Sequence, residues 1–161
     1  MIILAIDSGI ERCGFALFQN IPGNPKLVDS GLLSTPKTDS IEKRLSNLKK
    51  GFDNLLQKHK PNLVIMESLF FFVNKKTFIS VAQSQGALLA SCGRDLISVE
   101  FLTPLQIKQI VTGYGKTDKK GVEKMIMMLL GIKVAPKPDD VVDAIAAGYA
   151  YCCLHKFDHI K

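Results

Sequence analysis

Residues 2–7 read IILAID, a short apolar run that ends abruptly in Asp7. An apolar run of this length is typical of a strand that is buried on both faces of a sheet. Gly9 then permits a turn, and residues 13–19 (CGFALFQ) have the alternation of a second strand. These two segments predict a sheet whose first strand carries a carboxylate at its carboxyl end.

The segment after these strands continues the sheet. Residues 20–25 (NIPGNP) are rich in the residues that form hairpin turns, and a third strand follows over 26–35. Short connections can join antiparallel strands, whereas parallel strands need a longer crossover. The first three strands are therefore predicted to form an antiparallel meander.

The hydrophobic period changes after the third strand. Apolar side chains recur at helical spacing over 40–59, and Asp39 is the predicted N-cap, with Glu42 as its reciprocal partner. Pro61 ends this helix, and residues 63–67 (LVIME) form a fourth strand that again ends in an acid.

The remaining segments alternate between helix and strand. Thr103-Pro104 is predicted to cap and open a short helix, and Asp139 to cap the last one. Strands that alternate with helices predict an α/β fold with a mixed five-stranded sheet flanked by helices. The predicted elements are a helix over 76–92, a strand over 97–102, and helices near 118–130 and over 139–156.

Length and composition predict one folded domain over residues 1–161, since 47% of the residues are hydrophobic. No long apolar run and no secretory signal are visible, so we expect a cytoplasmic protein without a membrane partner. Lys and Arg number 21 against 15 Asp and Glu, and this excess suits a polyanionic partner such as nucleic acid. The four cysteines form no CxxC pair and are predicted to be reduced.

Four acids form the candidate site. Asp7 and Glu67 each end a predicted strand, while Asp140 and Asp143 are three residues apart at the start of a helix and share one face. Sites in α/β sheets form at the carboxyl ends of strands. One such acid alone is more often a turn or cap residue, but several close together repel one another unless a cation neutralises them. Carboxylates suit Mg²⁺ or Mn²⁺, and two such ions support phosphodiester hydrolysis.

Five short motifs resemble the RuvC family of Holliday junction resolvases in order and spacing: IILAIDSG, LVIMESLFF, SQGALLA, TPLQIKQIVTGYG and DDVVDAIAAGYA. The resemblance implies a ribonuclease-H-like fold, a homodimer that cuts four-way DNA junctions, and a branch-migration helicase as partner. It also implies Mg²⁺ or Mn²⁺, two ions per subunit, held by Asp7, Glu67, Asp140 and Asp143. Ser8 stands where the family has proline, which predicts a looser turn, and Cys13 stands where threonine is common.

Aromatic and basic residues near these motifs are candidate DNA contacts. Phe70 and Phe71 follow Glu67, and an aromatic ring there would stack on an unpaired base, although core packing is the commoner role of such residues. The resemblance singles out Phe70, Lys108 and Lys119, and the other lysines are candidate phosphate contacts. The full predicted set is Phe70, Phe71, Asn74, Lys75, Lys76, Lys108, Lys116, Lys119 and Lys120.

Several other functions are compatible with parts of this pattern. The Asp7-Ser8-Gly9 turn also resembles the first phosphate loop of the actin and sugar-kinase superfamily, but those proteins need two such domains. A branched-DNA-binding module with weak catalysis, a broader structure-selective nuclease and a nuclease for structured RNA also remain open. The helix over 76–92 is apolar on more than one side, and one side is the predicted two-fold contact of the dimer.

Overall fold

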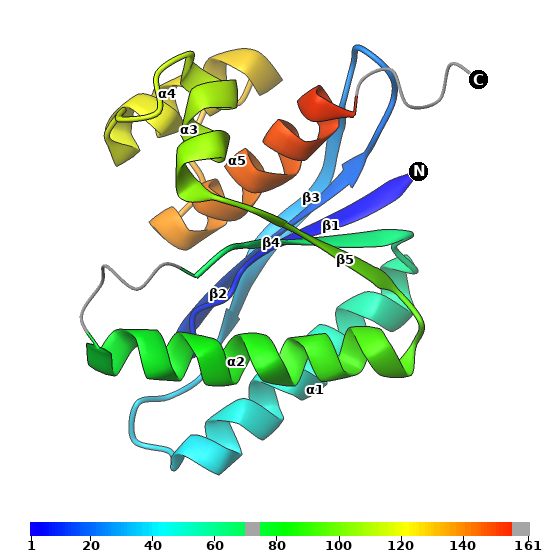
Figure 1. Cartoon of the computed structure of the whole chain (residues 1–161), viewed down its shortest axis with the longest axis vertical. Helices are drawn as coiled ribbons and strands as arrows, with labels where there is room; N and C mark the ends of the chain where they lie inside the picture. The colour runs from blue at the N-terminus through cyan, green and yellow to red at the C-terminus, as the bar shows by residue number, and fades with distance from the viewer. Residues whose placement is uncertain (70–74, 156–161) are drawn as a thin grey trace.

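The computed structural model describes residues 1–69 and 75–155 and places five strands in one mixed sheet (Figure 1). The order across the sheet is β3-β2-β1-β4-β5. The first three strands are antiparallel, as predicted, whereas β4 runs parallel to both β1 and β5. The strands are β1 (Ile2–Asp7), β2 (Arg12–Gln19), β3 (Lys26–Ser34), β4 (Leu63–Glu67) and β5 (Ser98–Leu102).

Helices cover both faces of the sheet (Figure 1). One face is covered by α1 and α2, and the other by α3, α4 and α5. This arrangement of strands and helices confirms the predicted α/β class. The helices are α1 (Ile41–His59), α2 (Lys75–Arg94), α3 (Pro104–Thr112), α4 (Lys119–Leu130) and α5 (Asp139–Leu154).

The apolar run of β1 is explained by burial on both faces. Ile3 and Ala5 pack into the core beneath α5, while Leu4 and Ile6 pack into the core beneath α1 and α2. All four side chains are fully buried. Since side chains alternate between the faces of a strand, a strand with a helix layer on each side must be apolar throughout. Only its last residue, Asp7, reaches the edge.

Small residues let α5 lie close to the sheet. A Cβ atom placed on Gly148 would come within 2.6 Å of the Phe18 ring and 3.1 Å of Ala5 Cβ. A side chain there would push the helix outward, because cores are already packed at crystal-like density. The start of α5 therefore lies close to the carboxyl end of β1.

The predicted helix starts were correct in one case and wrong in two. Thr103 caps α3 in a full capping box with Gln106, as expected for Thr-Pro. Asp39 does not cap α1: Ser40 takes the N-cap position, and Asp39 pairs with Lys43 at 2.8 Å. Asp139 does not cap α5 either, because it is the first residue inside that helix.

The structure also describes the cysteines and the hydropathy of the helices. Cys13, Cys92 and Cys152 are buried free thiols, and Cys153 is a half-buried one. Within the part of the chain that the structure describes, no helix has the length and apolar character needed to cross a bilayer.

Candidate active site

Asp7 and Glu67 end neighbouring strands and lie at the same edge of the sheet. Strands β1 and β4 are parallel, with Ile6 opposite Met66. The next residue of each strand is the acid, so both carboxylates leave the sheet side by side. Such carboxyl edges are where α/β folds place their sites.

Helix α5 supplies the other predicted acids. Asp143 lines the same pocket as Asp7 and Glu67, a cavity of about 480 Å³ that Lys108 and Lys119 also line. Asp140 does not line this pocket, but it is near enough for its charge to raise the pKa of Asp7. The predicted acids thus come from β1, β4 and α5, which are remote in sequence.

Burial and like charge dominate the electrostatics of this site. Burial, followed by the charges of Asp143, Glu67 and Asp140, raises the pKa of Asp7 to about 7. Burial and the charge of Asp143 also raise the pKa of Glu67, and burial raises that of Asp140. The fold therefore holds these carboxylates where a nearby positive charge is required for full ionisation.

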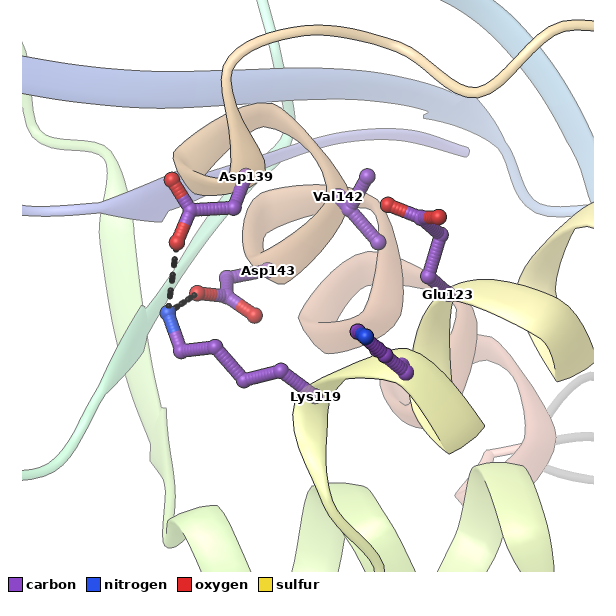
Figure 2. A pocket seen from close by; sticks show the side chains of 6 residues that line it. Lys119, Glu123, Asp139, Val142 and Asp143 are labelled. Carbon is purple, nitrogen blue, oxygen red and sulfur yellow. Dashed lines mark hydrogen bonds and ion pairs between the residues drawn. The ribbon is translucent and has the colours of Figure 1, made fainter.

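Three basic side chains supply positive charge at this site: Lys108 lines the pocket, and Lys119 and Arg12 pair with acids. Lys119 Nζ, at the start of α4, donates to Asp143 Oδ2 at 2.7 Å and to Asp139 Oδ2 at 3.0 Å (Figure 2). Arg12 Nε lies 3.0 Å from Asp140 Oδ2. Although burial lowers the pKa of Lys119, its bonds to Asp143 and Asp139 outweigh this and raise it, so the ammonium group stays charged.

The donor set fits a hard divalent cation. Asp140 Oδ2 is buried and takes part in no hydrogen bond with the described residues, although it faces Arg12 Nε. A buried carboxylate oxygen without a hydrogen bond, beside a carboxylate whose pKa is raised, is suited to Mg²⁺ or Mn²⁺. Across residues 1–69 and 75–155, however, no three His, Cys, Asp or Glu side chains form a ready-made ligand set. Lys119 and Arg12 instead pair with the carboxylates of α5, Asp139, Asp140 and Asp143.

Polar residues of α2 hold the two strand ends together. Gln85 Nε2 donates to the main-chain oxygen of Glu67 at 3.0 Å and to Ser8 Oγ at 3.3 Å. Ser84 Oγ donates to the main-chain oxygen of Ser8 at 2.6 Å. Ser8 itself is only 2% exposed. These contacts constrain the turn that was expected to be looser without a proline.

The sequence did not single out Gln85, Ser84, Arg12 or Asp139 as parts of this site. A run of three polar residues, Gln83 to Gln85, interrupts a largely apolar helix segment, and this marks polar positions without indicating what they contact. Arg12 and Asp139 carried no comparable signal, because surface charges of this kind are common.

The predicted DNA contacts are distributed around the pocket. Lys108 and Lys119 line it, and Lys120 lines a smaller cavity of about 150 Å³ beside it. Lys116 is exposed in the loop between α3 and α4. Lys75 and Lys76 open α2, while the predicted contacts that lie outside the described residues are Phe70, Phe71 and Asn74.

Comparison with known proteins adds independent findings. Residues 3–151 match the family model described as crossover junction endodeoxyribonuclease RuvC. A protein of that name from Clostridioides difficile is 39% identical over 158 residues, which cover 98% of this chain and 94% of the relative. Another from Fusobacterium nucleatum is 39% identical over 146 residues, covering 91% of this chain and 77% of the relative.

Solved structures support the fold. RuvC of Thermus thermophilus, in complex with a Holliday junction substrate, has a TM-score of 0.90 at 24% identity and covers 98% of this chain and 96% of its own. The yeast mitochondrial Holliday junction resolvase has a TM-score of 0.69 at 16% identity, with 98% and 80% covered. Both structural matches agree with the ribonuclease-H-like arrangement of the sheet. From the family model and the identity to its relatives, the chain belongs to the RuvC family of crossover junction endodeoxyribonucleases.

Proposed function

We propose that this chain cuts four-way DNA junctions by metal-dependent hydrolysis of phosphodiester bonds. The observation that carries the proposal is the convergence of Asp7, Glu67 and Asp143 on one pocket that Lys108 and Lys119 also line. Acids alone would repel a phosphate, and lysines alone would only bind it. The combination supports a site that holds a cation and a phosphodiester together.

The four acids have distinct positions toward the cation. Asp7 is the most enclosed by other acids, so we assign it to the centre of the ligand set, with Glu67 and Asp143 beside it. Asp140, whose Oδ2 accepts no hydrogen bond from the described residues and is held by the ion pair with Arg12, would complete the set. Two bound Mg²⁺ or Mn²⁺ ions would supply a nucleophilic water and neutralise the charge on the leaving oxygen.

The lysines act on the DNA. Lys108 and Lys119 present ammonium groups at the same pocket as the acids, and we assign them to the phosphate that is cut. Lys116 and Lys120 lie farther along the loop and α4, where they suit flanking phosphates. Contacts of this kind fix the position of the strand and carry no information about its sequence.

A homodimer is the proposed active form, and α2 supplies its contact. Exposed residues of α2 recur with the spacing 4, 3, 4 and 3, which is the seam of two helices packed along each other. These residues are Ile79, Gln83, Gly86, Ala90 and Gly93, which we call the α2 stripe. A Cβ atom at Gly86 or Gly93 would meet nothing within 4 Å. The stripe is open to a second copy of the chain, and two-fold symmetry suits the paired cuts that a junction needs.

Cleavage of a mobile four-way DNA junction tests the proposal, with a linear duplex and a three-way flap as competing substrates. Mg²⁺ and Mn²⁺ are supplied separately, and EDTA is the blank. We expect paired symmetric nicks in the junction alone, which EDTA abolishes. Equal cutting of all substrates would retain the nuclease chemistry and reject junction selectivity.

Asp7→Asn distinguishes cleavage from binding. The substitution removes one charge at nearly constant volume, so we expect cleavage to be lost while junction binding, measured by gel shift, is kept. Asp29→Asn is the matched control, because Asp29 lies on β3 and pairs with Lys58 and His59. Retained cleavage by Asp7→Asn would refute the metal site. Tight binding without nicks by the wild type would favour a branched-DNA-binding protein.

A further inference from the structure

A fifth acid, Asp139, lies next to the site but outside the predicted ligand set. It is the first residue of α5, directly before Asp140. Its Oδ2 accepts the 3.0 Å hydrogen bond from Lys119, and its Oδ1 accepts a longer one, 3.5 Å, from Arg12 Nη2. Figure 2 shows Lys119 extending from α4 toward Asp139 and Asp143 together. Asp139 therefore contacts both Lys119 and Arg12.

Each of these basic residues also contacts one candidate metal ligand. Lys119 holds Asp143, and Arg12 faces Asp140. The side chain of Asp139 is 50% exposed, against 24% for Asp143 and 17% for Asp140. Lys119 and Arg12 are thus each shared between the exposed carboxylate of Asp139 and a more buried candidate ligand, which we call the inner carboxylate: Asp143 for Lys119 and Asp140 for Arg12.

This sharing matters when a divalent ion binds. Asp143 and Asp140 cannot bind the ion at full strength while their oxygens are paired with Lys119 and Arg12. Lys119 and Arg12 must therefore release Asp143 and Asp140 when the divalent ion binds. A basic side chain that would be left without any carboxylate opposes this exchange. Asp139 is the carboxylate that the exchange leaves in place.

We propose that Asp139 is a positioning residue that retains Lys119 and Arg12 beside the site while a divalent ion takes their inner carboxylates. The inference rests on the proposed function only through the presence of a divalent ion. Asp139 lowers the cost of releasing Asp143 and Asp140, and it keeps the Lys119 ammonium group near the pocket where a phosphate would bind. It is not itself a ligand.

Direct measurement of Mn²⁺ binding to the full chain without DNA, by titration calorimetry, tests the proposal. Asp139→Asn is expected to raise the dissociation constant about tenfold, because the displaced ammonium group loses a charge-assisted hydrogen bond. Asp139→Glu restores the carboxylate and is expected to stay within about twofold of the wild type. Glu123→Gln is the matched control. Glu123 and Asp139 line the same cavity of about 150 Å³, but Glu123 pairs with Lys137 at 3.7 Å and not with Lys119 or Arg12.

Removal of Lys119 separates the proposed role from simple loss of negative charge. In a Lys119→Met background, Asp139 retains only its longer, 3.5 Å contact with Arg12, so the effect of Asp139→Asn should fall to about twofold. A tenfold effect in both backgrounds, or an effect of Glu123→Gln equal to that of Asp139→Asn, would overturn the proposal. So would unchanged binding in Asp139→Asn.

The same titration distinguishes this inference from the proposed function. If the wild type binds Mn²⁺ with the expected dependence on Asp139 but cuts no junction, the positioning role stands and the nuclease assignment fails. If junctions are cut and Asp139→Asn binds Mn²⁺ as the wild type does, only the positioning role fails. A wild type that binds no Mn²⁺ would overturn both.

Discussion

Asp7 combines two properties that oppose each other in the protein without metal. It ends a strand whose preceding residues are fully buried, and it shares a pocket with Glu67 and Asp143. Its carboxylate is therefore both poorly hydrated and close to like charges, which raises its pKa to about 7. A group that destabilises the fold when it is ionised is retained for what it binds.

The sign of this effect predicts how stability depends on pH. The pKa of Asp7 rises from 3.8 to about 7 on folding, so the unfolded chain loses its proton first and stability falls between pH 4 and pH 7. In EDTA at pH 8, Asp7→Asn should therefore raise the free energy of unfolding by about 2–4 kcal/mol, since one pKa unit corresponds to about 1.4 kcal/mol. Near pH 3 the two proteins should be equal. Urea unfolding at several pH values measures both.

Asp53→Asn is the control for this prediction, because it should change the free energy of unfolding at pH 8 in the opposite direction. Burial opposes the shift, but hydrogen bonds from Arg94 and Lys49 hold the pKa of Asp53 at about 2. Its charge stabilises the fold above pH 4, and removing it should lower stability at pH 8. A fall in stability for Asp7→Asn at pH 8 would contradict the raised pKa.

At the scale of elements, the site depends on how closely α5 approaches the sheet. Gly14 lies on β2 opposite Asp7. A Cβ atom at Gly14 would collide with the main-chain oxygen of Asp140 and would lie 3.0 Å from Val141 N. Glycine at this position therefore lets the start of α5 lie against the strand end that carries Asp7.

Gly14→Ala should accordingly disturb both the fold and the site. The added methyl group meets backbone, which moves only if α5 moves, so we expect a loss of about 1–3 kcal/mol in unfolding free energy. Mn²⁺ affinity should fall as well, because Asp140 and Asp143 are displaced from Asp7. Asn54→Ala is the control: it changes an exposed position of α1 and should raise stability by up to about 1 kcal/mol, because alanine favours helix. Equal stability of Gly14→Ala and wild type would show that α5 is not held this closely.

The elements show what was predictable from the sequence. The apolar run of β1, the turn-rich segment before β3 and the helical period of α1 each depend on local patterns, and all three were predicted close to their observed bounds. The N-caps of α1 and α5 were not, because the carboxylates of Asp39 and Asp139 form ion pairs instead. Whether an aspartate caps a helix or pairs with a lysine depends on where that lysine lies.

The site, like the helix caps, contains some features that local sequence patterns predict and others that depend on distant residues. Asp7 and Glu67 were identifiable because each ends an apolar run, and the spacing of Asp140 and Asp143 placed them on one helix face. The contacts of Gln85 with Ser8 and Glu67 join segments that are far apart in the chain. No local pattern encodes such contacts, so they became visible only once α2 was placed against the strand ends.

At the scale of the whole molecule, the described residues of one chain bring together one set of acids, whereas a four-way junction must be cut on two symmetric strands. A two-fold pair of chains meets this need without a second site in the chain. The α2 stripe is the surface we assign to the contact, and Figure 1 shows α2 beside α1 on one side of the sheet. Its glycines would let two helices approach closely, and Ile79, 59% exposed, would become buried.

Gly86→Glu tests this assembly. A side chain at Gly86 meets nothing within 4 Å in the isolated chain, and glutamate favours helix over glycine, so the fold should keep its stability. In the dimer, two-fold symmetry would bring the two new charges close to each other in a desolvated seam. Light scattering at micromolar concentration should then show a dimer for the wild type and a monomer for Gly86→Glu. Gln57→Glu adds the same charge at an exposed position of α1 and should stay dimeric.

The junction assay should show the same loss of assembly. Gly86→Glu should still cut single strands, because each monomer keeps its four acids, but its two cuts should no longer be paired. A wild type that is monomeric at these concentrations, or a Gly86→Glu variant that still forms dimers, would contradict the α2 contact.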